Sequence, residues 1–416
     1  MTETQTTTWD RGKFLDLTEF REVEEVLRRG KDFVVTGTKA GSEEFSHGTI
    51  LTTDGRTHLA RRRALMRMIG PNQPWGAEGT LVDEVFAHNL HSLRVTSTPK
   101  DNVIGFDLIE FCRRVTWRVT AALVGIDGVD DDATVAQFEQ LATPIVEGLV
   151  IEYHPEERHP QILAAARTAR QRVQEDLFDP SLERRRKLVE ASRHQDSAPV
   201  EMPADLLTSM LIAAGDEEPD TGAIFREMVV LLAGSVNNPV SMTIWALDDL
   251  LPWLDEHPEF RDRASERDFL NRAVTETLRL HRASRPHLVR ITADDTVLES
   301  SGRRIPKGQW VSCWVQAANR DPSVFGPDAD RYDPYRTPLD PEVPPFGIGF
   351  GAGPHTCLGR PLVLWEQGGS HAQGLLIKLM RFLLAEGLRI DPAGVQQEDG
   401  PAGGRRFTRY DVLIRA

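Results

Sequence analysis

One cysteine of this chain, Cys357, lies in a segment whose composition suits metal or cofactor chemistry. From Phe350 to Gly359 the segment reads F-G-A-G-P-H-T-C-L-G. Its glycines can adopt positive φ angles and let the backbone approach a flat ligand closely. A helical pattern follows, so Cys357 precedes a helix N-terminus, where free N–H groups favour a thiolate. Such a thiolate can hold one metal ion, with backbone donors tuning the sulfur.

Three other interpretations of Cys357 compete with this one. An isolated cysteine is often a buried apolar residue without chemistry. An iron–sulfur cluster normally needs four cysteines, and this chain has only Cys112, Cys313 and Cys357. The G-I-G-F-G-A at 347–352 matches a loose dinucleotide fingerprint, but it follows P-P-F and no βαβ unit surrounds it. The spacing therefore favours a haem with one axial thiolate and with His355 in reach of a haem propionate.

The same segment resembles the haem-binding loop of the cytochrome P450 family, F-G-x-G-x-H-x-C-x-G, at every fixed position. The resemblance extends over most of the chain. It implies a mainly α-helical, triangular haem fold with small β-sheets, built by residues 1–416 as a single haem-thiolate domain. It also implies haem b (iron protoporphyrin IX) as cofactor and Cys357 as the metal ligand. Phe350, Gly351 and His355 are then expected to contact the cofactor.

Two other basic residues, His58 and Arg62, are four positions apart in a predicted helix that Gly70 and Pro71 close. They share one face of that helix. From the spacing alone, a solvated basic face is an equally good interpretation. The resemblance implies instead that the pair binds a haem propionate, and that Arg290, in H-L-V-R-I-T-A, is a second propionate-binding arginine.

A long helix is predicted from a cap at Asp220 to about Leu251. Its middle, L-L-A-G-S-V-N-N-P-V-S, contains Gly234 and Pro239, which are both costly in a helix interior. A kink is therefore expected, and a kink in a central helix often marks a ligand site. Packing of small residues against another helix would explain the same pattern.

In the resembled family this helix crosses the distal face of the haem and carries A-G-x-[D/E]-T-T. Ala233 and Gly234 match the A-G, but residues 235–238 are S-V-N-N, so the acid and both threonines are missing. In the family, that acid–threonine pair relays protons during dioxygen activation. An amide such as Asn237 does not titrate and cannot readily relay a proton. Ala233, Gly234 and Asn237 are therefore the candidate catalytic residues.

Two reactions remain open at this point. Either substrate groups and water supply the protons, and the chain is a ferredoxin-dependent monooxygenase, or the substrate already carries its oxidant. In the second case an N–O or O–O bond would undergo atom transfer, nitrene transfer or rearrangement. We favour the second reaction, because the acid and both threonines are replaced together. Natural-product tailoring, as in antibiotic biosynthesis, is common to both. A non-catalytic haem carrier or gas sensor is disfavoured, because a sensor usually has an output module and one fold uses the whole chain.

The segment E-T-L-R, from Glu276 to Arg279, predicts an ion pair across one helical turn. On a surface such a pair contributes only ~0.2–0.5 kcal/mol. The resemblance identifies it with the family's E-x-x-R and makes Arg336 its third member. A buried network of this kind would fix the loop that leads to Cys357.

The net charge of −14 argues against nucleic acid as a partner. No stretch approaches 18 consecutive apolar residues, and the N-terminus has neither a signal nor an anchor pattern. Three dispersed cysteines do not form a disulfide framework. We expect a cytoplasmic monomer that acts on a small organic substrate without a membrane. A ferredoxin and a ferredoxin reductase are partners that the resemblance implies.

The remaining patterns predict a polar peripheral arm at the N-terminus, a series of helices, a surface connection and short strands. The arm is 1–20; the helices are 16–29, two within 80–126, 130–190 with an interruption at 154–160, one from 205 and 265–282; the connection is 183–203; and the strands fall within 31–53, 297–311 and 407–414.

Overall fold

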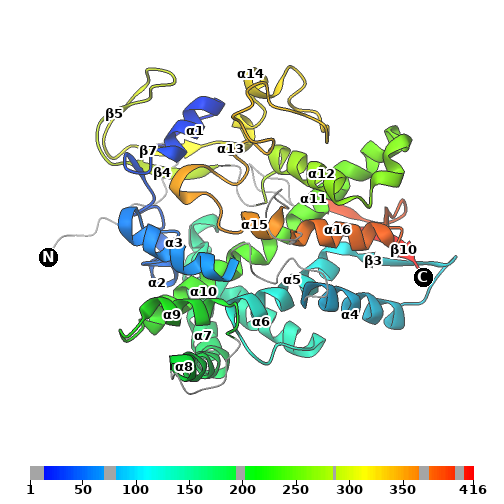
Figure 1. Ribbon diagram of the computed structural model, residues 1–416, viewed down its shortest axis with the longest axis horizontal. Coiled ribbons are helices and arrows are strands. Elements are labelled where there is room, and N and C mark those ends of the chain that lie inside the picture. Colours follow the sequence, from blue (N-terminus) through cyan, green and yellow to red (C-terminus); the bar gives the residue numbers. More distant parts are fainter. Residues whose placement is uncertain (1–13, 70–80, 194–201, 284–286, 365–373, 399–406) are drawn as a thin grey trace.

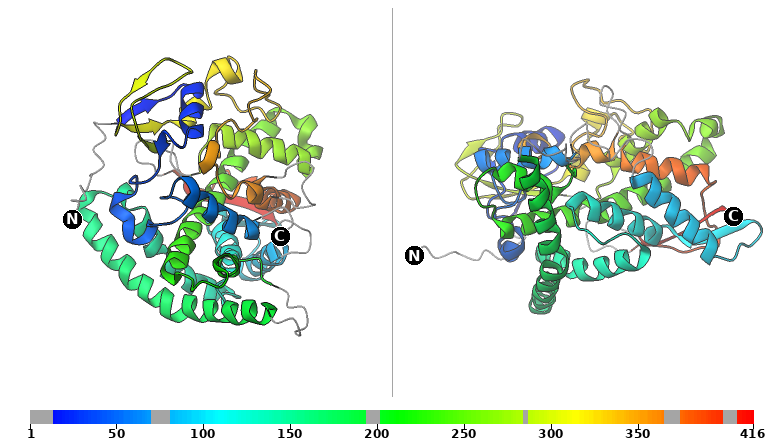
Figure 2. Two further views of the ribbon diagram at one scale, coloured as in Figure 1. Left: turned by 60° about the vertical axis from the view of Figure 1, so that its left-hand side comes forward. Right: turned by 60° about the horizontal axis from the view of Figure 1, so that its bottom comes forward.

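The fold is described from a computed structural model of the chain, which covers residues 14–69, 81–193, 202–283, 287–364, 374–398 and 407–416 (Figure 1). The chain is mainly α-helical, as predicted. Two small sheets lie at different edges of the helical body (Figures 1 and 2).

The helices follow one another along most of the chain, and a short π-helical segment (Gln174–Phe178) joins two of them. They are α1 (Phe20–Arg28), α2 (Glu43–Ser46), α3 (Gly55–Ile69), α4 (Leu81–Thr96), α5 (Leu108–Val124), α6 (Asp132–Leu149), α7 (His159–Val173), α8 (Asp179–Arg193), α9 (Leu206–Ala214), α10 (Thr221–Ser235), α11 (Asn237–Glu256), α12 (Arg267–Leu280), α13 (Val315–Ala318), α14 (Pro322–Phe325), α15 (Arg360–Val363) and α16 (Leu375–Ala385).

The strands are short, except for the last one. They are β1 (Phe14–Leu17), β2 (Phe33–Val34), β3 (Val103–Asp107), β4 (Leu288–Thr292), β5 (Thr296–Val297), β6 (Arg304–Ile305), β7 (Trp310–Cys313), β8 (Arg389–Ile390), β9 (Gln396–Glu398) and β10 (Phe407–Arg415). One sheet has the order β1-β7-β4-β2, in which β1 is parallel to β7 and the other pairs are antiparallel. The second has the order β3-β10-β8, with β9 also paired to β10, and is antiparallel. β5 and β6 form a separate hairpin.

Aspartate side chains begin several of the longer helices. The carboxylates of Asp107, Asp131, Asp205 and Asp220 each accept a backbone N–H of the first turn, at α5, α6, α9 and α10 respectively. Such caps satisfy N–H groups that have no partner within the helix. The cap predicted at Asp220 is confirmed.

The predicted long central helix is present, but it is broken rather than smoothly kinked. α10 ends at Ser235, and α11 runs from Asn237 to Glu256. Val236, between them, has distorted helical angles, φ −94° and ψ −69°. Pro239 lies in the first turn of α11, where a missing N–H costs nothing. The break therefore precedes the proline, at the position where α11 begins.

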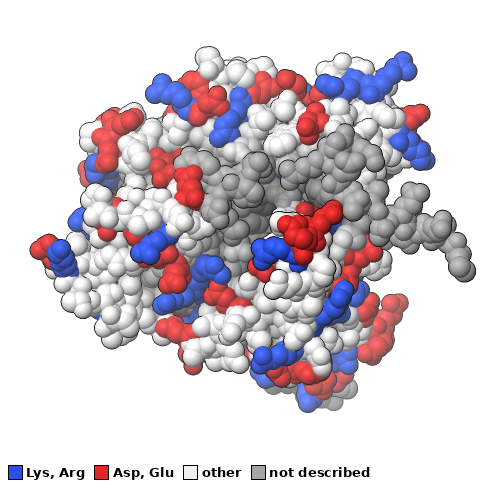
Figure 3. All heavy atoms as spheres, turned by 180° about the vertical axis from the view of Figure 1, so that it is seen from behind, with Lys and Arg blue, Asp and Glu red and all other residues white. Residues whose placement is uncertain are grey.

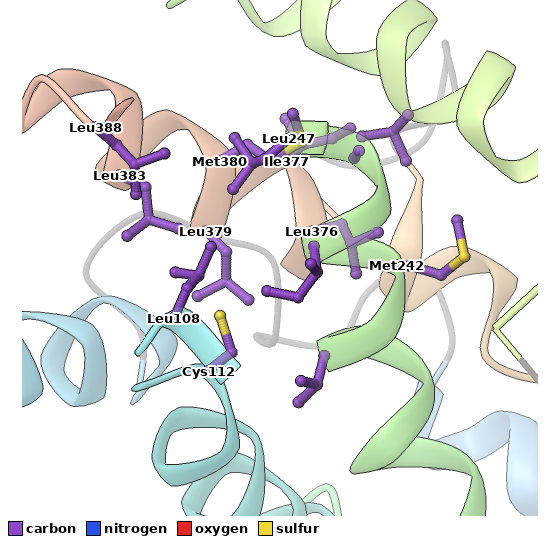
Figure 4. Close-up of a cluster of buried hydrophobic side chains, with 14 of the residues drawn as sticks. Leu108, Cys112, Met242, Leu247, Leu376, Ile377, Leu379, Met380, Leu383 and Leu388 are labelled. Carbon is purple, nitrogen blue, oxygen red and sulfur yellow. The ribbon is translucent and has the colours of Figure 1, made fainter. Parts of the chain in front are cut away.

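The hydrophobic core has one cluster between α5, α11, α12 and α16 (Figure 4). Cys112 is fully buried in this cluster, close to Leu108 and Leu379 in Figure 4, which confirms its interpretation as a core residue. Burial also raises the pKa of the Cys112 thiol. A second cluster joins α6, α7 and α10, and a third packs α1 against the first sheet. The region between these clusters holds the Cys357 loop.

Two predictions near the N-terminus are wrong. The helix expected at 16–29 begins only at Phe20, because Phe14–Leu17 is strand β1 and not part of a peripheral arm. The segment 49–53 is a turn and not a strand. There the hydroxyls of Thr49 and Thr52 both donate to the carbonyl of Ser46, at 2.7 and 2.6 Å. Such local hydrogen bonds compete with strand pairing.

Further along the chain, the interruption expected at 154–160 is confirmed by two short 3-10 turns, Ile151–Tyr153 and Glu156–Arg158. The sequence did not predict β3. α8 continues through the charged residues up to Arg193, so the surface connection expected from 183 is wrong there. The rest of that connection, 194–201, lies outside the described residues, as does the 1–13 part of the predicted arm.

One stretch of the described residues, Thr221–Glu256, is long and apolar enough to cross a membrane by composition alone. However, 61% of its apolar window is buried inside the protein, as in the core helix of a soluble protein. On the face shown in Figure 3, acidic and basic side chains are intermixed.

Candidate active site around Cys357

The segment from Phe350 to Cys357 forms a closed loop. The Cys357 N–H donates to the carbonyl of Phe350 at 2.8 Å, and a 3-10 turn (Gly353–His355) lies between them. Gly353 has φ +67°, and a Cβ there would lie 2.5 Å from the carbonyl oxygen of Leu27. Glycine is therefore required both by the conformation and by the contact with α1. A helix does follow Cys357, but α15 covers only Arg360–Val363, and 365–373 lies outside the described residues.

The Cys357 side chain is exposed to solvent, although protein groups surround its thiol closely enough to act on its pKa. Burial raises the pKa of Cys357, while the backbone N–H groups of Gly359 and Arg360 and the guanidinium groups of Arg282 and Arg62 act to lower it. The predicted backbone donors are thus present, but for the free thiol burial outweighs them. A thiol that is surrounded by protein and still accessible suits ligation of a bound metal, whose charge replaces the proton.

α3 packs its predicted basic pair against the Cys357 loop. His58 Nε2 lies 3.0 Å from the Pro354 carbonyl, and Arg62 Nη1 donates to the Thr356 carbonyl at 2.7 Å. The two side chains therefore face the site, as the helical spacing predicted. By contrast, the next residue, Arg63, is exposed on the surface.

His355 lies beside His58, with ring centroids 4.0 Å apart. Its Nε2 is 3.0 Å from Asp54 Oδ1, an ion-pair partner that the sequence did not predict. Burial raises the pKa of Asp54, but hydrogen bonds from His355 and Thr36 outweigh burial and lower this pKa to about 2. Asp54 therefore stays ionised and anchors His355.

Two further arginines approach the site from the segment after α12. Arg290, predicted from the sequence, is buried on β4, and its Nη1 donates to the Val289 carbonyl at 2.8 Å. Arg282, which sequence analysis missed, acts electrostatically on both Cys357 and Arg290. The sequence around Arg282 did not indicate a functional role, because a single arginine after the end of a helix is usually exposed to solvent.

The E-x-x-R pair is a buried, two-pronged ion pair. Arg279 Nε and Nη2 donate to the two carboxylate oxygens of Glu276 at 2.8 and 2.7 Å. Arg336 Nε donates to Glu276 at 3.1 Å, which confirms the predicted third member. Arg279 Nη1 also donates to the carbonyls of Asn319 and Ala329, at 2.7 and 2.6 Å. The network thus holds the segment without regular secondary structure that leads toward the Cys357 loop.

The break between α10 and α11 contains the predicted distal residues. Gly234 is exposed, and a Cβ on it would meet open space, whereas Ala233 and Asn237 are half-buried. The Ser235 hydroxyl donates to the Leu231 carbonyl at 2.6 Å, so it is engaged in the backbone of α10. Asn237 is the first residue of α11. Neither an acid nor a free hydroxyl occurs at 233–238.

Two surface hollows lie elsewhere. The larger, about 530 Å³, is lined by α6 and α7 residues such as Gln137 and Arg172. The smaller, about 280 Å³, lies beside α12. Cys357 lines neither of them. Among the residues that the structure describes, no group of three or more His, Cys, Asp or Glu side chains could hold a metal ion. A metal at Cys357 would therefore need most of its ligands from a cofactor.

The residues present fit a haem. Cys357 is accessible within the protein, Gly234 leaves open space, and Arg282 has buried donors that no described residue satisfies. The sequence profile of the family named Cytochrome P450 matches residues 13–368. The chain belongs to the cytochrome P450 family, and is thus a P450-type oxidoreductase of a haem-containing family.

Relatives with known activities match over part of their length. The erythromycin C-12 hydroxylase of Saccharopolyspora erythraea is 34% identical over 167 residues, which are 39% of this chain and 39% of that protein. The cyclomarin C epoxidase of Salinispora arenicola is 33% identical over 173 residues, or 40% and 39%. The matched part thus spans about two fifths of these relatives. The ligand-free structure of cytochrome P450 TbtJ1 has a TM-score of 0.70 and 20% identity, and covers 99% of this chain and 94% of its own. This last likeness supports the fold.

Proposed function

We propose that this chain is a cytoplasmic, monomeric haem-thiolate enzyme of secondary metabolism that tailors a small organic natural product. We further propose that the substrate brings its own oxidant as an N–O or O–O bond. That bond breaks as an oxygen or nitrogen atom is transferred or the skeleton rearranges, so no outside electrons are consumed. Residues 1–416 then act as one haem-thiolate domain.

The cofactor in this proposal is haem b, with Cys357 as its protein ligand. Bound haem supplies oxygen-transfer and one-electron chemistry. His58, Arg62, Arg290 and His355 would hold its propionates, and their convergence on the Cys357 loop supports this role. Phe350, whose carbonyl closes that loop, and Gly351 would contact the ring.

The observation that carries the proposed reaction is the composition of the break between α10 and α11. Asn237 replaces an acid–threonine pair with an amide that does not titrate. The one hydroxyl within residues 233–238, on Ser235, donates to the Leu231 carbonyl at 2.6 Å. The chain therefore lacks a side chain at 233–238 that could pass protons. Asn237, half-buried at the start of α11, would instead donate to or accept from a polar group of the substrate.

A second candidate is a ferredoxin-dependent monooxygenase with substrate-assisted dioxygen activation. The named activities of two relatives favour this candidate, because one relative is a hydroxylase and the other is an epoxidase. In this case groups of the substrate and bound water would take the place of the missing relay. A ferredoxin and a ferredoxin reductase would then be required partners.

The two candidates differ in what they consume. We would incubate the purified protein without dioxygen and without reductant, using O-acylhydroxylamines and organic peroxides as probes, and follow products by mass spectrometry. The Cys357→Ala variant controls for reactions of released haem. The proposal predicts anaerobic turnover with the wild type alone. Product that forms only with dioxygen, ferredoxin and reductase would support the monooxygenase instead.

A further inference from the structure

The direction of Arg282 is fixed by the residue before it. α12 ends at Leu280, and His281 is extended, with φ −119° and ψ 150°. The His281 ring stacks on Trp245, with centroids 4.1 Å apart and planes 9° apart, and its Nε2 lies 3.2 Å from Asp249. Successive side chains of an extended segment point to opposite sides. Anchoring His281 on α11 therefore turns Arg282 the other way, toward Cys357.

Arg282 has no carboxylate neighbour among the described residues that act on it. Burial lowers the pKa of Arg282 to about 10, and the groups that also act on it are Cys357, Arg290 and Cys313. Burial raises the pKa of the Cys313 thiol to about 12. The remaining charge, on Arg290, is another cation.

The guanidinium also has donors without an acceptor. Arg282 Nε and Nη1 are buried and have no hydrogen-bond partner among the described residues, the Cys357 sulfur included. By contrast, Arg62 and Arg290 donate to carbonyls at 2.7 and 2.8 Å. Buried donors of a charged group are unfavourable when they have no acceptor. The two donors are therefore placed to bind an acceptor, such as a carboxylate, that the described residues do not provide.

We propose that Arg282 binds a carboxylate group next to Cys357 in the loaded protein. The planar fork of an arginine matches the two oxygens of a carboxylate. Two sources have this chemistry: a propionate of the haem, or an acidic group of the substrate, in which case the substrate class is an organic acid. The inference rests on the proposed function, because it requires haem to be ligated by Cys357.

The first arm of the test measures haem release. Haem transfer from the holoenzyme to excess apomyoglobin would be compared for the wild type, Arg282→Gln and Arg282→Lys, with the exposed Arg261→Gln as the matched control. If the carboxylate is a propionate, Arg282→Gln should release haem roughly 10- to 100-fold faster, the value of a charged hydrogen bond. Arg282→Lys should be intermediate, because it keeps the charge. A packing role alone would make Lys and Gln equally harmful.

The second arm measures binding of acids by the shift of the Soret band. Dodecanoate and indole-3-acetate would each be titrated beside the corresponding methyl ester. If the carboxylate belongs to the substrate, haem release stays unchanged and the wild type binds an acid more tightly than its ester. Arg282→Gln should then lose this preference by roughly 10-fold or more.

The proposal is overturned if Arg282→Gln releases haem like the wild type and no Arg282-dependent preference for acid over ester is found. Failure of the proposed function would look different. In that case the wild type itself would lack the red-shifted Soret band of a carbonyl-bound haem-thiolate protein, before any variant is compared.

Discussion

Glu227, on α10, is expected to make the free energy of unfolding depend on pH. It is fully buried, and its two carboxylate oxygens accept the Ile50 N–H at 3.2 Å, with Arg61 Nε 3.6 Å away. Burial raises the pKa of Glu227 from 4.5 to about 7, although Arg61, the Ile50 N–H and Arg226 act in the opposite direction. The folded protein therefore retains a proton that the unfolded chain has released.

The sign follows from this order of pKa values. Between pH 4.5 and 7 the folded chain binds more protons than the unfolded chain, so the free energy of unfolding falls as pH rises. The stabilisation is complete below pH 4.5 and is lost above about 7. At about 1.36 kcal/mol per pKa unit the full loss is roughly 3 kcal/mol. With an unfolding entropy of roughly 2.1 cal/mol/K per residue over 416 residues, this corresponds to about 3–4 °C in Tm.

The perturbation is Glu227→Gln, which keeps an acceptor for the Ile50 N–H but cannot ionise. Calorimetric Tm values of the holoprotein would be measured from pH 5 to pH 8. The Tm of the variant minus that of the wild type should increase by roughly 3 °C over this range, whatever its value at pH 5. The exposed Glu259→Gln is the control and should show a constant difference. A constant difference for Glu227→Gln as well would refute the reasoning.

Three other predictions concern the site. Cys357→His should abolish the red-shifted Soret band of the reduced, carbonyl-bound protein, whereas Cys112→Ala and Cys313→Ala should keep it; a band retained in Cys357→His contradicts the assignment of the ligand. Glu276→Ala should give protein with little haem by absorbance, because it strands a buried charge at roughly 3–5 kcal/mol; wild-type occupancy would show that the network does not support the loop. Asn237→Thr should lower product formation on a preactivated substrate about 5- to 150-fold, since an unsatisfied buried partner costs ~1–3 kcal/mol; improved coupling of electron consumption to product would favour the monooxygenase.

The proximity of the basic residues to Cys357 could be predicted from sequence, but their partners could not. Spacing placed His58 and Arg62 on one helical face, and the short interval to Cys357 placed His355 in the loop. Asp54 binds His355 across 301 positions of sequence, which no local pattern reveals. Arg282 was missed for a related reason, because its surroundings come from β4, β7 and the Cys357 loop.

Errors in the fold have a similar origin. The β-branched residues within 49–53 fit a strand, but the hydroxyl of Thr49 donates to a carbonyl of its own turn. Leu17 continues the apolar pattern of α1, yet pairing with β7 makes Phe14–Leu17 a strand. A hydrogen bond within the turn thus decides the conformation of the first segment, and pairing with a distant strand decides that of the second. The long, capped helices were predicted well, because their partners lie within the same segment.

The pairing of distant strands has a consequence for biosynthesis. β1 pairs with β7 and β3 pairs with β10, so each sheet joins segments roughly 300 residues apart in the chain. At about 5–20 residues per second, the ribosome needs roughly 15 to 60 s to deliver the second partner. During this interval the edges of β1 and β3 have no strand beside them, and the apolar α11 emerges before α16, which packs against it. The nascent chain therefore depends on its helices to stay compact until β7 and β10 have been synthesised.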